Sequence, residues 1–504
     1  MGVARLRVAG LDAGASALVA LLALAGCDLG PDYHRPGLEI SPAYRASTAP
    51  AEAAWPSADW WRGFGSAELD TLIDEARREN FDLLAAIARV QQADAQIRIA
   101  GASLLPALGA SANASWEQLS LANSGRGVST RNLDLHDYST GLNATYLLDF
   151  WGKAAAARQA AVASAMFSRF DQQTVALTVV TSVASTWFTA LGDADQLAVQ
   201  QHNLADAEQT LAVMRGRLDA GTASALDVAQ QEALVAGIRA TIPNLRSQME
   251  QEVIGLGILT GRPPEAVTVQ PGTLDSLTLP AVAAGLPASL LQRRPDVASA
   301  EAQLIAANFD VKVARAAFFP QIQLTGSAGF ESTALGMLFG PGGFLTSAAA
   351  SLAQPLFDGG TLRGQLEQAK GRQAELLADY RKAVVQAFTD VDNALTAWRY
   401  ATEQERLQRV AVDTARRAAD IARAQMQAGT VDITTVLTAE TTLFADQTTL
   451  VQVRLARVEA LLSLYKALGG GWIEPSGPVT DQFPGLSPGA VPGGVALPIG
   501  GNVR

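Results

Sequence analysis

Two long stretches without proline place the strongest constraint on how this chain folds. Residues 153–216 and 361–427 contain no proline and are rich in Ala, Gln, Glu and Arg, with Leu and Val interspersed. This composition is typical of helices that pack closely as coiled coils. At a rise of 1.5 Å per residue, each helix would be about 95–100 Å long, well beyond the usual helix of a globular domain. The sequence therefore predicts two very long helices.

Each long stretch is followed by a glycine turn and then by a shorter helical pattern. The turns are centred on Gly221 and Gly429, and the shorter helices are expected over residues 224–260 and 432–468. A returning helix of this length covers only part of its long partner. Additional helices near 80–103 and 296–317 are expected to stack end to end with the returning ones. A plain antiparallel coiled-coil stalk would have the same geometry.

The two halves of the chain repeat one pattern. Matching positions are separated by a nearly constant offset of 208 to 214 residues. A period this long is too large for a solenoid repeat, so it indicates duplication of a whole architectural unit. The expected repeats cover about residues 66–285 and 286–472. The matched pairs are Pro106 with Pro320, Asp149 with Asp358, and Gly221 with Gly429.

Each half also contains two segments in which apolar and polar residues alternate. Such a period of two is typical of strands with one apolar and one wet face. Strands are expected at about residues 107–118, 138–148, 320–331 and 345–356. Their length is about that of a tilted strand that crosses a bilayer. A pair of hairpins in a soluble sheet would show the same alternation.

Four strands cannot close a barrel, and an open sheet edge is not tolerated in lipid. Membrane barrels need about eight strands or more, so a chain with four strands must combine them with those of further copies. Two copies would leave little lumen, whereas three would give twelve strands around a pore. The expected fold is mainly α with a membrane β-barrel: a trimeric channel-tunnel with a 12-stranded barrel and a long α-helical barrel.

The N-terminus has the features of a lipoprotein signal peptide. Arg5 and Arg7 precede an apolar stretch at residues 15–25, which is too short to span a bilayer. Leu24-Ala25-Gly26-Cys27 then matches the bacterial lipobox, and Cys27 is the only cysteine in the chain. We expect residues 1–26 to be removed and Cys27 to carry a covalent lipid, including palmitate. After removal, no run of 18 or more apolar residues remains.

Composition argues against several other functions. The net charge of −11 disfavours nucleic acid as a partner, and a single cysteine excludes an internal disulfide or a cysteine-based zinc site. The three histidines, His34, His136 and His202, are too scattered for a local metal motif. Without a nucleophile–base pair, phosphate loop or metal cluster, an enzyme is the weakest hypothesis, and no cofactor is expected.

Several motifs occur in the order found in a known family. The chain resembles the TolC-like outer membrane factors, in the NodT-type lipoprotein branch that serves tripartite RND-type efflux systems. The resemblance extends from Cys27 to about Trp472 and includes both repeats. The motifs are Cys27-Asp-Leu-Gly-Pro-Asp-Tyr-His-Arg-Pro36, Trp60-Trp61 before Phe64, Arg293-Arg294-Pro295-Asp296-Val297, and Tyr465-Lys-Ala-Leu-Gly-Gly-Gly-Trp472.

The resemblance implies a homotrimer that acts as a passive exit duct in the outer membrane. Its substrates would be small molecules such as drugs, toxic compounds or metal ions, and its partners a periplasmic adaptor and an inner-membrane pump. A mixed equatorial domain would hold residues 38–65, 261–290 and those after 468. Asp28 follows the anchor cysteine, and in some bacteria that residue type retains lipoproteins in the inner membrane. The barrel strands favour the outer membrane.

The same resemblance suggests functional residues at the two turns. Adaptors of TolC-like proteins meet the tips, so the expected contacts are Gly221, Ala225, Leu226, Asp227, Gly429 and Asp432. The periplasmic gate is expected near the start of the last helix, at Asp432, Ile433, Leu437 and Glu440. There Thr438 replaces the carboxylate that the family often carries. Asp432 or Glu440 would supply the charge instead, or Ile433 and Leu437 would close the tip hydrophobically.

Two alternative functions remain open on the sequence alone. One is a channel for type I protein secretion, and the other is a lipid-anchored coiled-coil structural protein without a pore. The lipobox favours the efflux branch over secretion, and the alternating hairpins favour a pore over a stalk. Residues 473–504 are rich in Pro and Gly, match no part of the pattern, and are expected to be disordered.

Overall fold

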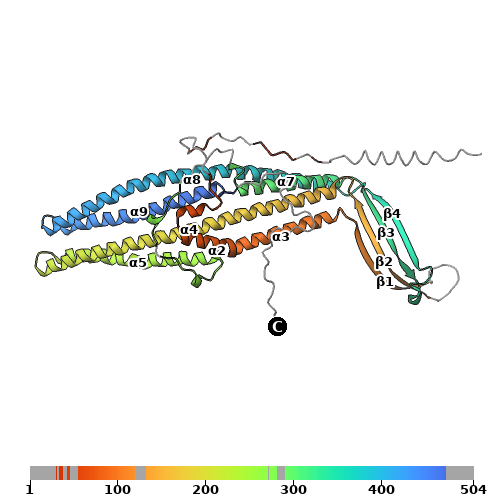
Figure 1. Ribbon diagram of the computed structural model, residues 1–504, viewed down its shortest axis with the longest axis horizontal. Coiled ribbons are helices and arrows are strands. Elements are labelled where there is room, and N and C mark those ends of the chain that lie inside the picture. The colour runs from red at the N-terminus through yellow and green to blue at the C-terminus, as the bar shows by residue number, and fades with distance from the viewer. Residues whose placement is uncertain are drawn as a thin grey trace, which may run out of the picture. The chain divides into compact units, whose positions relative to one another are not determined.

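The structure is a computed structural model that describes residues 30, 33–37, 43–45, 55–120, 132–270, 272–280 and 290–472. The predicted signal peptide, Cys27 and the C-terminal tail lie outside these residues. The described part is mainly helical, with one small sheet (Figure 1). In chain order the elements are η1 (Trp60–Phe64), α2 (Ala67–Glu79), α3 (Phe81–Ala102), β1 (Ala107–Ser120), β2 (Asn132–Leu148), α4 (Lys153–Asp219), α5 (Ala225–Thr260), η3 (Pro264–Ala266), η4 (Leu274–Ser276), α7 (Pro295–Ala316), β3 (Gln321–Ser332), η5 (Leu335–Met337), β4 (Phe344–Ala353), α8 (Thr361–Gln427) and α9 (Ile433–Ala467).

The chain divides into two compact units. The first comprises residues 1–39, 75–179 and 299–386, and the second comprises residues 40–74, 180–298 and 387–504. Because α4 and α8 are continuous helices, each contributes its first part to the first unit and its remainder to the second.

The sheet belongs to the first unit and is antiparallel throughout, in the order β1-β2-β3-β4 (Figure 1). This confirms the four strands predicted from the alternating segments. β4 ends at Ala353 rather than near residue 356, because Pro355 has no N–H to donate to a ladder. At the centre of the sheet Gly141 faces Gly329, where a Cβ on Gly329 would lie 2.4 Å from the Thr140 carbonyl oxygen. Glycine is required at this crossing.

Beyond the sheet, the first unit is built from helices that flank it in sequence. Ile97 of α3 packs with Ala161, Val162 and Ala165 of α4 in a small core. Where the helices meet the sheet, the indole N–H of Trp151 donates to the carbonyl oxygen of Pro320 at 2.6 Å. The same indole stacks on Phe319, with 4.8 Å between ring centroids. This contact joins the β2–α4 junction of the first repeat to the α7–β3 junction of the second.

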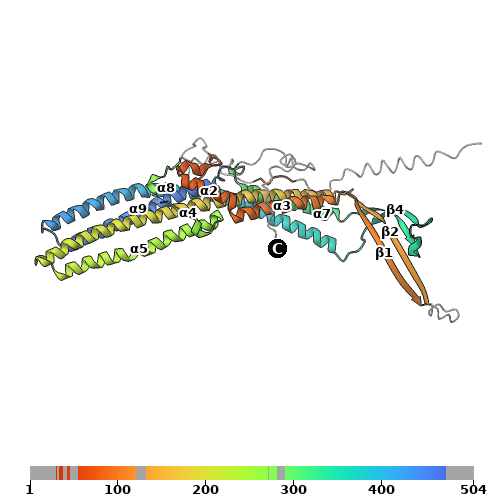
Figure 2. The same cartoon turned by 60° about the horizontal axis from the view of Figure 1, so that its bottom comes forward.

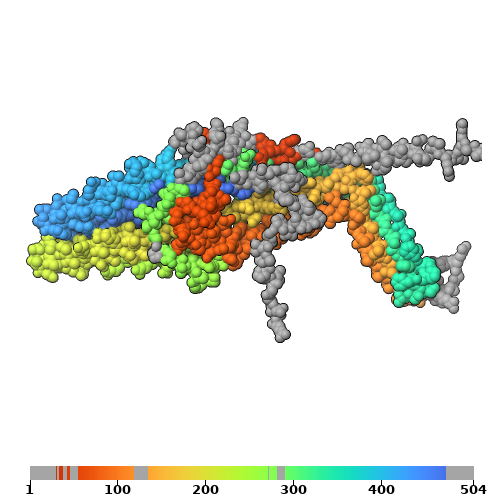
Figure 3. All heavy atoms as spheres, in the orientation of Figure 1, coloured from red at the N-terminus to blue at the C-terminus, as the bar shows by residue number. Residues whose placement is uncertain are grey.

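The second unit holds two helical hairpins, α4 with α5 and α8 with α9, which lie side by side in both ribbon views (Figures 1 and 2). One apolar core joins residues of all four helices, among them Ala207, Val235, Ala419 and Val436. In the space-filling view the atoms of the two hairpins pack against each other (Figure 3). Close approach is possible because many of the core residues are alanine or valine.

An aromatic cluster fastens the segment before α2 to this unit. Trp60 stacks on Tyr465 of α9 at 4.6 Å, and Phe64 contacts Phe188 of α4 at 4.9 Å, measured between ring centroids. Both Trp60 and Phe64 are buried. The Trp60-Trp61 motif singled out in the sequence therefore belongs to a core that joins η1 to α4 and α9.

By length and composition alone, one helix among the described residues, α4, could cross a membrane. In its most apolar window of 18 residues, 56% of the residues are buried inside the protein. Val183, Trp187 and Phe188 of α4 are almost inaccessible to solvent. This burial is typical of a core helix.

Candidate functional site: the helix tips and their grooves

The two tips of the second unit are built in the same way. Gly221 and Gly429 have φ angles of 69° and 74°, which an L side chain would adopt only with strain. After each glycine a threonine closes the turn. The Thr222 amide and hydroxyl both donate to the Arg217 carbonyl oxygen, and those of Thr430 donate to the Gln425 carbonyl oxygen. The duplicated sequence thus produces duplicated turns.

The returning helices begin with side-chain caps. Ser224 accepts a hydrogen bond from the Asp227 amide at 3.2 Å, and the Asp227 carboxylate accepts one from the Ser224 amide at 2.8 Å. Asp432 accepts hydrogen bonds from both the amide and the hydroxyl of Thr435, each at 3.0 Å. These caps occupy backbone N–H groups at the start of each helix. What each tip offers to a partner is therefore largely its exposed side chains.

At the first tip, an apolar side chain is left uncovered. Leu226 is 66% exposed, and Ala225 beside it is exposed as well. At the second tip the position 208 residues later is Thr434, also exposed. The first tip is thus the more apolar of the two.

A buried ion pair lies behind the second tip. Arg423 of α8 donates from Nε to Glu440 of α9 at 2.8 Å, and Glu440 is completely inaccessible to solvent. Two residues of α4 complete the cluster: Thr210 donates its hydroxyl to Glu440 at 3.0 Å, and Asp206 lies 3.4 Å from Arg423. The cluster therefore connects the two hairpins through their interior.

Sequence reasoning missed this cluster, although the duplication contains a signal for it. Adding the offset of 208 residues to Arg215 and Glu232 gives Arg423 and Glu440. Arg215 and Glu232 form the equivalent pair at 2.6 Å, but their side chains are 59% and 48% exposed. One repeat thus carries on its surface the pair that the other buries.

The predicted gate residues occupy three different environments. Ile433 and Glu440 are buried inside the chain, Leu437 packs partly against the shared core, and Asp432 is exposed at the helix cap. Of the four, only Asp432 is on the surface, and Leu437 is half-buried. The two buried residues hold α9 in place, since Ile433 belongs to the shared core and Glu440 pairs with Arg423.

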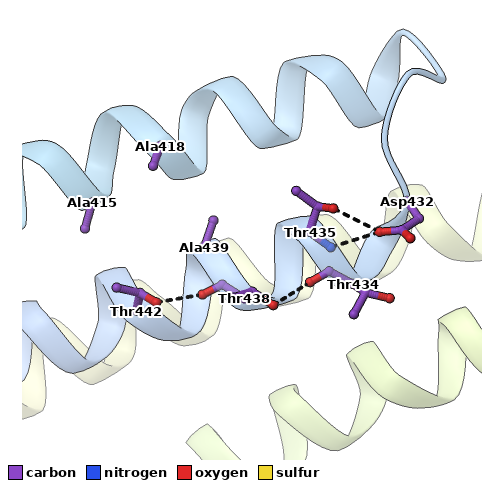
Figure 4. Close-up of a pocket in the computed structure, with 8 residues that line it drawn as sticks. All are labelled: Ala415, Ala418, Asp432, Thr434, Thr435, Thr438, Ala439 and Thr442. Carbon is purple, nitrogen blue, oxygen red and sulfur yellow. Dashed lines mark hydrogen bonds between the residues drawn. The ribbon is translucent and has the colours of Figure 1, made fainter.

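A groove of about 500 Å³ runs between α8 and α9 next to the second tip (Figure 4). The Thr438 and Thr442 hydroxyls donate to carbonyl oxygens one turn earlier, at 2.8 and 2.9 Å. Because these hydroxyls are engaged by their own helix, the groove presents mainly methyl groups, with hydroxyl oxygens as acceptors. It is lined by Ala415, Ala418, Asp432, Thr434, Thr435, Thr438, Ala439 and Thr442.

A second groove, between α4 and α5, lies at other positions of the repeat and has a different chemistry. Glu208, Arg215, Glu232 and Arg239 contribute to its lining. Two ion pairs bridge it, Arg215 with Glu232 and Arg239 with Glu208. The α8–α9 groove is lined by no such pair, so a partner helix could approach its backbone more closely.

Among the described residues, no group of three or more His, Cys, Asp or Glu side chains is placed to hold a metal ion. The described charged clusters instead consist of arginine–carboxylate pairs. Glu405, which is 4% exposed, lies within 2.8 Å of both Arg409 and Arg457. These arginines hold the pKa of Glu405 below its ordinary value against the opposing effect of burial.

Comparison with known proteins identifies the family. The model of the outer membrane efflux protein family matches residues 72–262 and 286–470. The pyoverdine export outer membrane protein OpmQ of Pseudomonas aeruginosa is 40% identical over 459 residues, which cover 91% of this chain and 96% of that protein. The cation efflux system protein CusC of Escherichia coli is 32% identical over 456 residues, covering 89% and 97%.

Solved structures share the fold. A membrane protein from Pseudomonas aeruginosa superposes with a TM-score of 0.82 at 30% identity, covering 89% of this chain and 99% of that one. A crystal structure of CusC gives a TM-score of 0.78 at 30% identity, covering 88% and 100%. These likenesses confirm the predicted fold class and the resemblance on which the functional expectation was based.

Proposed function

Because the chain belongs to the outer membrane efflux protein family, we propose that it is the passive exit duct of a tripartite pump, working as a homotrimer. The observation that carries this proposal is the four-stranded sheet, whose outer strands β1 and β4 each pair on one side only within the chain. An unpaired edge is not tolerated in lipid. Pairing β4 of one copy with β1 of the next closes twelve strands into a barrel.

The exported compounds are proposed to be small molecules. Two relatives are named for export of pyoverdine and for cation efflux. A passive duct provides only the path through the outer membrane. The inner-membrane pump supplies the energy, so the duct needs no catalytic residue of its own. The test is export from a strain that lacks the chain's gene: loss of export of a small compound, restored by the wild-type gene, supports the proposal. Unchanged export of drugs and metal ions, with loss of a secreted protein, favours the type I secretion alternative.

The mature protein is proposed to carry a covalent lipid on Cys27. The lipobox sequence and the absence of any second cysteine support this assignment. Several acyl chains bury enough methylene groups to hold a protein on a membrane stably. We expect Cys27→Ser to abolish labelling with radioactive palmitate, and unchanged labelling would contradict the assignment. Fractionation of the wild type then tests outer-membrane sorting in the presence of Asp28.

The adaptor is proposed to dock at the two tips. Supporting features are the exposed Ala225 and Leu226, and the methyl-lined groove that begins at Asp432. The proposed contacts remain Gly221, Ala225, Leu226, Asp227, Gly429 and Asp432. A helical hairpin of the adaptor could pack closely against such small side chains.

A bulky side chain at the first tip tests the docking surface. We expect Ala225→Trp to abolish efflux-dependent resistance and crosslinking to the adaptor, while trimerisation is unchanged. The matched control is Ala240→Trp, an exposed alanine of the same helix about 22 Å further along. If both variants export normally, the tip is not the docking surface.

The periplasmic gate is proposed to lie at the start of α9. In this proposal Asp432 and Leu437 approach the axis of the trimer, whereas Ile433 and Glu440 hold α9 in position from inside the chain. We expect Leu437→Ser to raise the conductance of the purified protein in planar bilayers. High conductance of the unmodified protein would show that these residues do not close it.

A further inference from the structure

The motif that follows Cys27 contains a contact that the duct function does not explain. Residues 33–37 lie against α7, where Tyr33 and Arg35 both bind Glu301. The Tyr33 hydroxyl donates to Oε1 at 3.0 Å, Arg35 Nε donates to the same oxygen at 2.7 Å, and Arg35 Nη2 donates to Oε2. We call the described residues Gly30 and 33–37 the strap and these contacts the clamp.

The clamp joins a buried carboxylate to an arginine whose side chain is 47% exposed. Glu301 is 8% exposed, so its carboxylate is removed from solvent and satisfied by strap residues. Arginine reaches both oxygens of the carboxylate, the two-pronged geometry that gives arginine–carboxylate pairs their specificity. Burial and the neighbouring Glu301 both raise the pKa of Tyr33, which keeps its hydroxyl protonated as a donor.

A second contact shows the direction in which the strap runs. A Cβ on Gly30 would lie 2.1 Å from Cγ of Lys312, so the backbone at Gly30 packs directly against the methylene groups of that lysine. Lys312 is eleven residues beyond Glu301 on α7, or about 16 Å nearer the end of the helix. The strap therefore runs antiparallel to α7, with its N-terminal end toward the sheet.

The contacts at Gly30 limit where Cys27 can be. Two residues lie between them, and each of the three steps along the chain spans at most about 3.6 Å, so chain connectivity keeps Cys27 within about 11 Å of Gly30. α7 ends at Ala316, four residues after Lys312, and β3 begins at Gln321. Just before β3, Trp151 stacks on Phe319, and tryptophan is one of the residue types enriched where membrane meets water.

From these contacts we propose that the strap is a tether of fixed length, held by Glu301, which sets the acylated Cys27 at the membrane-proximal end of the sheet. The partner that this arrangement fits is the lipid surface of the leaflet beside the strand ends. Glu301 is a positioning residue: it touches no lipid, and it fixes the point from which the anchor reaches the membrane. The proposal rests on acylation of Cys27, which is proposed above.

The clamp is tested by the mobility of the strap. Since Cys27 would be acylated, the variant His34→Cys offers one free thiol, on an exposed residue between the two clamp residues. A nitroxide at that position is expected to show an immobilised spectrum in the full-length protein in lipid. Glu301→Ala and, separately, Arg35→Ala should each abolish the immobilised component. Glu367→Gln, which changes an exposed carboxylate of α8, should leave it unchanged.

These outcomes separate the tether from the lipid anchor. A mobile label in the otherwise unmodified protein, or one that stays immobile in both clamp variants, overturns the clamp. Palmitate labelling is measured in every variant. If the wild type carries no palmitate, the lipid anchor fails and the tether with it, whereas palmitate labelling with a mobile strap overturns the tether alone.

The length of the tether is tested by shortening it. Deletion of Pro31 and Asp32 keeps Asp28 beside the anchor and keeps the clamp residues. It shortens the chain between Cys27 and the clamp by about 7 Å. We expect fewer trimers in the outer membrane at unchanged palmitate labelling, and recovery of trimers when Arg35→Ala releases the strap. If the deletion has no effect while the clamp is intact, or if Arg35→Ala fails to relieve it, the anchor height is not set by the clamp.

Discussion

At the scale of single residues, the two repeats place the same ion pair in different surroundings. Glu440 is fully buried, Arg423 is 25% exposed and both contact residues of α4, whereas Arg215 and Glu232 remain on the surface. Breaking a buried pair typically costs about 3–5 kcal/mol, because it leaves one charge buried without its partner. An exposed pair contributes about 0.2–1 kcal/mol. The exposed pair Arg215–Glu232 therefore serves as a matched control for the pair Arg423–Glu440.

We predict that Arg423→Ala lowers the free energy of local opening at the tips by about 3–5 kcal/mol. The matched variant Arg215→Ala should lower it by less than about 1 kcal/mol. Amide hydrogen exchange in the purified protein measures both, in α8 and α9 for Arg423→Ala and in α4 and α5 for Arg215→Ala. Equal effects of the two substitutions would show that the buried cluster does not hold the hairpins together.

A second residue-scale prediction concerns pH. Burial, and then the nearby charge of Glu252, raises the pKa of Asp193 from its ordinary value of 3.8 to about 6. The folded state therefore binds a proton more tightly than the unfolded state, and stability falls as the pH rises from about 4 to about 6. Asp193→Asn should raise the thermal midpoint at pH 7–8 and have little effect near pH 3.5. A gain that is equal at both pH values would contradict this assignment.

At the scale of elements, glycine has opposite consequences in a turn and in a helix. Gly429 has a positive φ at the second tip, where a Cβ is strained. Gly237 lies within α5 with no atom close enough to contact an added Cβ, so alanine there would only reduce the freedom of the unfolded chain.

Gly429→Ala is accordingly predicted to destabilise the protein by about 1–2 kcal/mol, and Gly237→Ala to stabilise it by about 0.5–1 kcal/mol. Thermal unfolding of the two purified variants compares them directly. The account of the tip turns would be wrong if Gly429→Ala were as stable as the wild type.

The elements were largely readable from the sequence, because their signals are local. Absence of proline predicted α4 and α8, and alternation predicted four strands. The environment of side chains was not readable in this way. Glu440 and Glu232 occupy equivalent positions, yet only Glu440 is enclosed: Thr210 of another helix binds it, and Asp206 of that helix pairs with its partner Arg423. The bond between Arg35 and Glu301 likewise joins residues that are far apart in the chain.

At the scale of the whole molecule, the sheet determines the assembly. All ten residues of β4 are exposed within one chain, and in β1 both Leu108 and Trp116 are more than 60% exposed. Both strands are also free on one edge, which in lipid must be paired. Neither feature suits an isolated chain, whereas both suit a barrel whose strands come from three copies.

The most direct test of this account is crosslinking between the edges of the sheet. Cysteine pairs with one member in β1 (residues 109–115) and one in β4 (residues 345–351) are introduced into the same chain and oxidised in the outer membrane. We predict that the best-aligned pairs give covalent species of two and three copies, and none larger. A series that stops at two copies, or one that continues beyond three, would contradict the twelve-stranded trimeric barrel.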